Sequence, residues 1–290
     1  MPRLAANISM MYTELPFMQR FEAAAKDGFR GVEFMFAYAY SAAAMAAQLQ
    51  QHGLQQVLLN APPGGGDNGC GDVAGSIATA WNSGMRGTAC LPGREAEFQS
   101  GVRLALQYAQ QLGCPRIHLM AGIAPTDAAP LLLLRTYVRN LRWAARLALD
   151  FGCEVLIEPI NTFDMPGYYL NHQTAAHAVL AEVAAPNCKV QMDLYHCHRM
   201  QTLKGGLEDR LESLADNLHR FIPTGNVAHL QIAGVPGRHE PEENAGSSTA
   251  VPWQSLLVLI DSLGYSGWIG CEYRPQAGTS AGLAWARPWL

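Results

Sequence analysis

Two kinds of hydrophobic pattern alternate along the whole chain. Short runs rich in Val, Ile and Leu, long enough for buried strands, are separated by longer stretches in which apolar residues recur every three or four positions. The strand-like runs are 3–10, 31–36, 55–60, 116–122, CEVLIEPIN, CKVQMDLYH, VAHLQIAG and GWIGCEYRP. The amphipathic stretches are 15–26, 42–51, 95–112, 132–150, 173–183, 207–221 and 253–263. This alternation predicts a parallel sheet covered by helices.

Eight strand-like runs separated by helical stretches in 290 residues match the usual size of a (β/α)8 TIM barrel. Several helical stretches are followed by a glycine that can cap the helix, namely Gly28, Gly53, Gly113, Gly152 and Gly264. A doubly wound open sheet is the alternative, but it would ordinarily carry a nucleotide-binding loop after its first strand, and NISMMYTEL contains no glycine. No change in composition marks a boundary, so we predict a single TIM-barrel domain over 1–290.

One segment interrupts the alternation. Residues 62–85, PPGGGDNGCGDVAGSIATAWNSGM, follow the third strand-like run and are rich in Gly, Asn and Asp, which predicts a long loop at the mouth of the barrel. A phosphate-binding loop is the alternative, but we find no Gly-Lys-Ser/Thr and no helix start after the glycines. We therefore expect this segment to be a lid or a contact in a homo-oligomer.

Composition narrows the class of partner. With 49% hydrophobic residues the chain can bury a full core, and a net charge of −4 with 15% charged residues gives no broad basic surface for nucleic acid. No apolar run approaches the roughly 20 residues of a membrane span, and the first ten residues lack the apolar core of a signal peptide. We expect a cytoplasmic protein that acts on small molecules. Cys153, Cys188 and Cys271 lie inside apolar runs and are expected to be buried hydrophobes rather than zinc or redox groups.

Each of the last four strand-like runs carries an oxygen-bearing side chain near its end: Glu158, Asp193, Gln231 and Glu272. The carboxyl ends of parallel strands open onto the ligand-binding face of a barrel, so we expect these side chains to converge. Three carboxylates and one amide suit Mg²⁺ or Mn²⁺ better than Zn²⁺ or copper. A single Glu at a strand end is commonly a cap or ion-pair residue, and only the set of four predicts a metal site.

Nearby cations and imidazoles are candidates for substrate binding. Arg238, seven residues after Gln231, and Arg86 in MRGTA can neutralise an anionic substrate, and His196 can hydrogen-bond a substrate hydroxyl. The alternative for Arg238 is a surface pair with Glu240 or Glu242.

Two further polar residues fit either a structural or a functional role. His198, like His196, could simply pack or lie at the surface. Glu33, at the end of the second strand-like run, faces the same mouth. A structural hydrogen-bonding role for Glu33 is as consistent with the sequence as a catalytic one.

Several stretches together resemble the hydroxypyruvate isomerase family, including its 2-oxo-tetronate isomerase branch, within the xylose-isomerase-like TIM barrels. They are FRGVEFMF, RGTACLPGREAEF, IEPINTFDMPGYYL, QMDLYHCHRM, HLQIAGVPGRHEP and GWIGCEYRPQ, and the similarity runs nearly end to end. The resemblance implies that Glu158, Asp193, Gln231 and Glu272 hold one divalent cation, and that Glu158 and Glu272 are the paired proton donor and acceptor. It also implies kinship with sugar epimerases in which a histidine ligand stands where this chain has Gln231.

The chain departs from the family pattern on the mouth loops. Gly234 stands where the family usually has Asp, and EENAGSST, within 242–250, replaces a Gly-Thr-Gly-Glu stretch. The 62–85 segment is longer than the resemblance leads us to expect. Because these changes lie on loops, they bear on the substrate more than on the chemistry.

The residues and the resemblance together predict an isomerase. Moving a carbonyl along one carbon requires a base and an acid for the proton, and a cation that stabilises the enediolate. We predict isomerisation of a short hydroxy-oxo acid, with hydroxypyruvate and 2-hydroxy-3-oxopropanoate (tartronate semialdehyde) as the reacting pair and a four-carbon 2-oxo acid as the nearest alternative substrate.

Other functions on the same barrel fit the sequence less well. A metal-dependent sugar epimerase or dehydratase is a further alternative. A multi-zinc phosphodiesterase would need more histidines at strand ends than His118 and His229, and an inactive binding protein would be expected to lose Glu158 or Glu272.

Overall fold

The structure is a computed structural model that describes residues 1–66, 71–200, 207–241 and 251–290. Eight parallel strands follow one another in chain order as a closed barrel. They are β1 (Arg3–Asn7), β2 (Gly31–Phe34), β3 (Gln55–Asn60), β4 (Arg116–His118), β5 (Glu154–Ile157), β6 (Cys188–Asp193), β7 (Val227–Ile232) and β8 (Trp268–Cys271). The predicted TIM barrel is confirmed.

The described helices alternate with these strands. They are η1 (Phe17–Gln19), α1 (Arg20–Lys26), α2 (Ala42–His52), α3 (Val73–Asn82), α4 (Glu95–Leu112), α5 (Pro130–Leu149), α6 (Gln173–Val183), α7 (Leu194–Met200), α8 (Leu207–Phe221), η2 (Ile222–Thr224), α9 (Trp253–Ser262) and η3 (Thr279–Trp289). Local chemistry sets their ends. Pro130 opens α5, where its missing N–H costs nothing, and Gly113 closes α4 with a φ of 61°.

Two α-helices lie where the sequence analysis expected none. Residues 62–85 contain α3, so the expectation of a loop throughout, with no helix start after the glycines, was wrong. Asp72 caps α3 by accepting a hydrogen bond from the Gly75 N–H (2.9 Å). The Gly- and Asn-rich flanks concealed the helical spacing of Val73, Ile77 and Ala80. The second helix, α7, begins directly after β6. Residues 67–70 lie outside the described residues, and the role of 62–85 stays a prediction.

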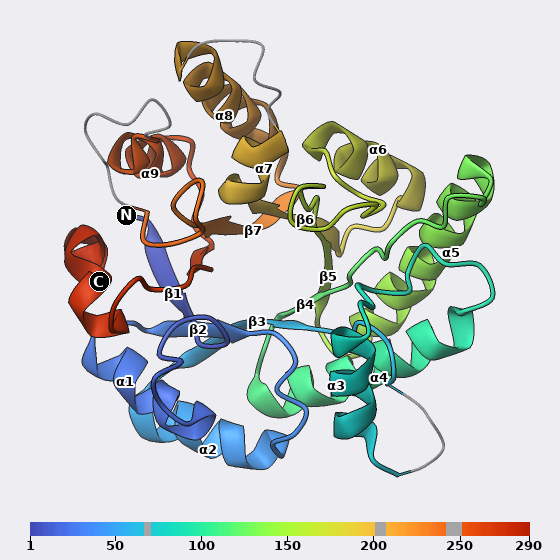
Figure 1. Cartoon of the computed structure of the whole chain (residues 1–290), viewed down its shortest axis with the longest axis horizontal. Coiled ribbons are helices and arrows are strands. Elements are labelled where there is room, and N and C mark those ends of the chain that lie inside the picture. The colour runs from blue at the N-terminus through green and yellow to red at the C-terminus, as the bar shows by residue number, and fades with distance from the viewer. Residues whose placement is uncertain (67–70, 201–206, 242–250) are drawn as a thin grey trace. The chain divides into compact units, whose positions relative to one another are not determined.

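The chain forms two compact units. The first contains Met1–Glu33, Gln48–Gln55 and Gln191–Leu290, and the second contains Phe34–Ala47 and Gln56–Val190. In the first unit β1 pairs with both β2 and β8, and β8 pairs with β7. Helices α8 and α9 lie side by side outside these strands (Figure 1). In the second unit β3, β4, β5 and β6 pair in succession. A single domain over 1–290 stays a prediction.

Strands of both units are buried on both faces, as expected for parallel strands covered by helices. Cys153, Cys188 and Cys271 are buried with free thiols, so the prediction that they pack as small hydrophobes is confirmed. Among the described residues no helix has the length and apolarity that crossing a membrane would require.

The C-terminal segment is tied to the loop that follows β1. Thr279, which is fully buried, accepts a hydrogen bond from the Tyr12 N–H through Oγ1 (2.6 Å), and its own N–H donates to Oε1 of Glu14 (3.0 Å). Tyr12 has a φ of 57°, a backbone conformation that bulky residues rarely adopt. The hydrogen bonds from η3 therefore help to hold the loop that leaves the first strand.

We expect Thr279→Val to lower the free energy of unfolding by about 1–3 kcal/mol, because it leaves the Tyr12 N–H buried without its acceptor. Urea unfolding followed by circular dichroism measures the loss. Ser280→Ala is the matched control: the Ser280 hydroxyl donates to Oδ2 of Asp27 (2.6 Å) at an exposed position, and its loss should cost about 0.5 kcal/mol or less. Equal losses in the two variants would contradict the role given to Thr279.

Candidate active site

The structure places the four predicted ligands at the carboxyl ends of consecutive strands. Asp193 is the last residue of β6 and Gln231 lies within β7, whereas Glu158 and Glu272 directly follow β5 and β8. All four are buried, with exposed fractions of 0% to 8%. Asp193, Gln231 and Glu272 belong to the first unit, and Glu158 to the second.

Asp193 is held by the helix that begins at the next residue. Its Oδ1 accepts a hydrogen bond from the Tyr195 N–H (2.7 Å), as an N-cap does. His196, one turn into α7, has its Nε2 3.6 Å from Oδ2 of Asp193. Asp193, His196 and Glu272 each offer one potential ligand atom, and these atoms lie within 4.8 Å of one another. The site is therefore a buried cluster of carboxylates and an imidazole that could bind a metal ion.

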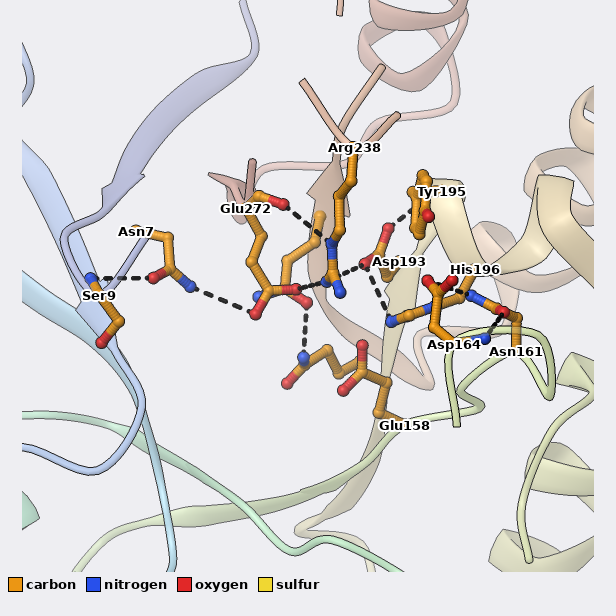
Figure 2. A network of polar contacts seen from close by, with 12 residues as sticks. Asn7, Ser9, Glu158, Asn161, Asp164, Asp193, Tyr195, His196, Arg238 and Glu272 are labelled. Carbon is orange, nitrogen blue, oxygen red and sulfur yellow. Dashed lines mark hydrogen bonds and ion pairs between the residues drawn. The ribbon is translucent and has the colours of Figure 1, made fainter. Parts of the chain in front are cut away.

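Arg238 contacts the two carboxylates of this cluster (Figure 2). Its Nη2 forms an ion pair with Oε2 of Glu272 and lies 3.4 Å from Oδ2 of Asp193. Its Nε donates to the Glu272 carbonyl oxygen (3.3 Å), and the guanidinium carbon lies 5.0 Å from the centroid of the Tyr195 ring. The side chain is 20% exposed, so one cation reaches the buried carboxylates from the edge of the site.

A tight loop after β7 brings Arg238 to this position. The Gly234 N–H donates to the carbonyl oxygen of His239 and the Arg238 N–H donates to that of Gly234, both at 2.8 Å. A Cβ at Gly234 would overlap the carbonyl oxygen of Glu240, so this loop conformation requires glycine there. The Glu240 carboxylate accepts from the Gln276 N–H (3.1 and 3.2 Å). Residues 242–250, with Glu242, lie outside the described residues.

Burial governs the electrostatics of both carboxyl groups. It raises the pKa of Glu272 to about 8; the Arg238 charge opposes this shift, and the charges of Asp193 and Glu33 add to it. Burial likewise raises the pKa of Asp193, against the opposing effects of Arg238 and of the N–H groups at the start of α7. A cation beside these groups would allow both to ionise.

A further set of buried polar side chains surrounds Gln231. Glu33, on β2, accepts hydrogen bonds from Nδ2 of Asn7 (3.0 Å) and Nε2 of Gln231 (2.7 Å), and Nε2 of His229 lies 2.6 Å from its other oxygen. Oε1 of Gln231 accepts from Nε2 of Gln191 (2.6 Å). Glu33 thus has the hydrogen-bonding role that was one of its two expected roles.

The sequence analysis missed Asn7 and Gln191, although a signal was present. Polar residues stand two positions apart in otherwise apolar strands, as Gln191 and Asp193 on β6 and as His229 and Gln231 on β7. Successive side chains of a strand point to opposite faces, so each pair shares one face. A period of two among the polar residues therefore indicates a polar lining on that face of these strands.

Glu158 and Arg86 lie in the second unit. Glu158 is buried, with Oε2 3.5 Å from Nε2 of His118. Arg86 is held against its own segment: Nη1 donates to the carbonyl oxygens of Trp81 (2.9 Å) and Met85 (2.8 Å), and its guanidinium carbon lies 3.8 Å from the centroid of the Trp81 ring. The structure thus brings Arg238 and His196 to the carboxylate cluster, while substrate binding by Arg86 stays a prediction.

Known proteins match this chain along its whole length. Residues 21–289 match the model of the xylose isomerase-like TIM barrel family. The chain is 49% identical over 290 residues to 2-oxo-tetronate isomerase from Cupriavidus necator. This match covers 100% of the chain and 99% of the relative. It is 38% identical over 289 residues to hydroxypyruvate isomerase from Escherichia coli, with 100% of both chains covered.

Solved structures also superpose on this chain along nearly its whole length. A protein from Brucella melitensis described as AP endonuclease, family 2, superposes with a TM-score of 0.85 at 40% identity, over 100% of this chain and 99% of the other. The 3-keto-D-glucoside 4-epimerase YcjR from E. coli superposes with a TM-score of 0.71 at 17% identity over 99% of both, a likeness of fold alone. The chain belongs to the xylose isomerase-like TIM barrel family, in the group of isomerases that includes 2-oxo-tetronate isomerase and hydroxypyruvate isomerase.

Proposed function

We propose that this chain is a metal-assisted isomerase that moves a carbonyl group between neighbouring carbons of a short hydroxy-oxo acid. The observation that carries the proposal is the buried cluster of Asp193, His196 and Glu272, with Arg238 against its carboxylates. In a chain 49% identical to an isomerase, such a cluster supports a site for a cation and an anionic substrate.

The donor set fits a hard divalent cation, Mg²⁺ or Mn²⁺. Asp193 and Glu272 would be ligands, because burial has removed the water that would otherwise stabilise their charge. Gln231 would add its carbonyl oxygen, and Glu158, which leaves the strand next to β6, would complete the set. When bound, the cation would supply Lewis-acid stabilisation of the negative charge that develops on the substrate oxygens.

Glu158 and Glu272 are the proposed proton donor and acceptor. Moving the carbonyl group requires one carboxylate to take a proton from the carbon beside the C=O and a proton to be returned to the neighbouring carbon. Glu272 is suited to this role because it is buried, and a cation beside it would keep its carboxylate ionised and able to accept a proton.

The remaining polar residues are assigned to the substrate. Arg238 would bind the substrate carboxylate, because its planar guanidinium matches a carboxylate in charge and geometry. His196 would hydrogen-bond a substrate hydroxyl. Arg86 is a second candidate for the substrate acid.

The comparisons bear on which acid is the substrate. The sequence analysis placed hydroxypyruvate first and a four-carbon 2-oxo acid second. The identity of 49% to 2-oxo-tetronate isomerase, against 38% to hydroxypyruvate isomerase, favours the four-carbon acid. We therefore propose 2-oxo-tetronate as the first substrate to test and hydroxypyruvate as the second. A cytoplasmic location and a homo-oligomer stay predictions.

Metal dependence tests the proposal as a whole. Protein stripped with EDTA and dialysed should lose turnover of both acids and recover it when Mg²⁺ or Mn²⁺ is added, because the developing charge needs a Lewis acid. Comparing kcat/KM for the two acids in the reconstituted protein ranks the substrates. Full turnover in metal-free protein would overturn the mechanism.

Substitutions at Glu158 and Glu272 should mainly affect kcat, whereas substitution at Gln231 should mainly affect metal binding. Glu158→Gln and Glu272→Gln each remove a proton-transfer group, so each should lower kcat by about 10²- to 10⁴-fold under saturating metal. Gln231→Ala removes only a neutral ligand and should mainly weaken Mn²⁺ binding. Near-normal kcat in either glutamate variant would show that the base lies elsewhere.

Arg238→Ala should raise KM for the acid substrate, and Arg238→Lys should recover part of the loss. In chelator-treated protein, Arg238→Ala should also lower the free energy of unfolding by about 3 kcal/mol, because two buried carboxylates lose their cation. Lys26→Ala is the control: Lys26 forms an exposed ion pair with Glu22 (2.7 Å), and its loss should leave both stability and KM nearly unchanged. An unchanged KM in Arg238→Ala would exclude the substrate contact.

A further inference from the structure

Glu33 is enclosed by hydrogen-bond donors from two other strands of the first unit. Nδ2 of Asn7 and Nε2 of Gln231 donate to Oε1, and Nε2 of His229 lies 2.6 Å from Oε2. The side chain is 1% exposed and His229 is fully buried. A carboxylate only accepts hydrogen bonds, so it fixes which end of each neighbouring polar group faces it.

This matters most for Gln231, because the two ends of an amide differ. Its carbonyl oxygen can bind a cation and its NH₂ group cannot, yet a half-turn of the side chain exchanges them. With the NH₂ group committed to Glu33, the oxygen faces the opposite way and accepts from Nε2 of Gln191 (2.6 Å). The Gln191 amide can donate or accept, so the contact with the Glu33 carboxylate is the one that sets the orientation.

Gly270, on β8, provides the room for this carboxylate. A Cβ at Gly270 would lie 2.5 Å from Oε1 of Glu33 and equally close to its Oε2 and Cδ, well inside contact distance. Gly270 is not among the glycines with positive φ, so the backbone does not require glycine there. The missing side chain is explained by the space that Glu33 fills.

Asn7 links this arrangement to the carboxylate cluster. The same Nδ2 that donates to Glu33 lies 3.4 Å from Oε1 of Glu272. Glu33 is therefore one hydrogen-bonded residue away from Glu272 and in direct contact with Gln231, while it is itself outside the group of potential ligands that includes Asp193, His196 and Glu272.

We propose that Glu33 is a positioning residue that selects the orientation of the Gln231 amide, so that the carbonyl oxygen of Gln231 is presented as a metal ligand, and that Gly270 supplies the space for it. This inference rests on the proposed function in one respect, since it takes Gln231 to be a ligand.

Mn²⁺ binding to metal-free protein, measured by isothermal titration calorimetry without substrate, provides the test. Glu33→Gln replaces a pure acceptor by an amide that can donate or accept, so Gln231 is no longer held in one orientation and Kd should rise by about 10- to 100-fold. Gly270→Ala displaces the Glu33 carboxylate and should weaken binding in the same direction. Glu14→Gln is the control: Glu14 accepts the Thr279 N–H, and the change should leave Kd unchanged.

An exchange variant separates positioning from general damage. In the double variant Glu33→Gln with Gln231→Glu, residue 231 presents an oxygen whichever way it turns, and the amide at 33 can donate to it. Mn²⁺ affinity should return to within a few-fold of the wild type, including when Glu33→Gln alone fails to fold. A folded exchange variant that binds Mn²⁺ as weakly as Gln231→Ala would overturn the proposal.

The single variants tell the two hypotheses apart. If Gln231→Ala binds Mn²⁺ like the wild type, Gln231 is not a ligand, and both the ligand assignment and the positioning role fail. If Gln231→Ala binds weakly while Glu33→Gln binds normally, the metal site stands and only the positioning role is overturned.

Discussion

The burial of negative charge is the constraint on which the site of this barrel depends. Glu33, Asp193 and Glu272 are each less than a tenth exposed, and an uncompensated buried carboxylate costs several kcal/mol. Each is compensated differently. Glu33 contacts Asn7, His229 and Gln231, Asp193 is held by the start of α7, and Glu272 is paired with Arg238. The polar strand residues, α7 and the loop after β7 all serve this need.

These different surroundings give the two glutamates, Glu33 and Glu272, different roles. Both oxygens of Glu33 contact buried side chains of other strands, so it is suited to holding its neighbours in place. Glu272 is balanced by a single arginine that enters from the edge of the site and is partly exposed. In the proposed function, Glu272 exchanges this partner for the cation or the substrate. The environment of each glutamate, rather than the residue type, thus decides whether it has a structural or a chemical role.

The fold could be predicted because its signals are local. Strand and helix periods, and glycines such as Gly113 and Gly264 that adopt positive φ after their helices, are visible in short windows. The ends of the strand-like runs likewise predicted the positions of Glu158, Asp193, Gln231 and Glu272 at the carboxyl ends of their strands. The helix α3 was missed because its flanks are rich in turn-forming residues, and α7 because it starts without a connecting loop.

The hydrogen-bonded partners could not be found in this way, because they depend on which strands become neighbours. Glu33 and His229 are 196 residues apart in the chain and 2.6 Å apart in space. The position of Arg238 depends on a loop in which that residue itself adopts a φ of 56°, a conformation that an arginine in isolation disfavours. Sequence spacing suggested that Arg238 was near Gln231, but not that it would pair with Asp193 and Glu272.

The fit of Glu33 into the space left by Gly270 also couples two positions that lie far apart in the chain. A side chain added at Gly270 would displace the Glu33 carboxylate. A shorter residue at position 33 would leave a cavity and remove the hydrogen-bond partner of three buried polar side chains. Neither position can therefore drift by itself. A substitution that fills one position is tolerated only where the other has been made smaller, so the two residues constrain each other.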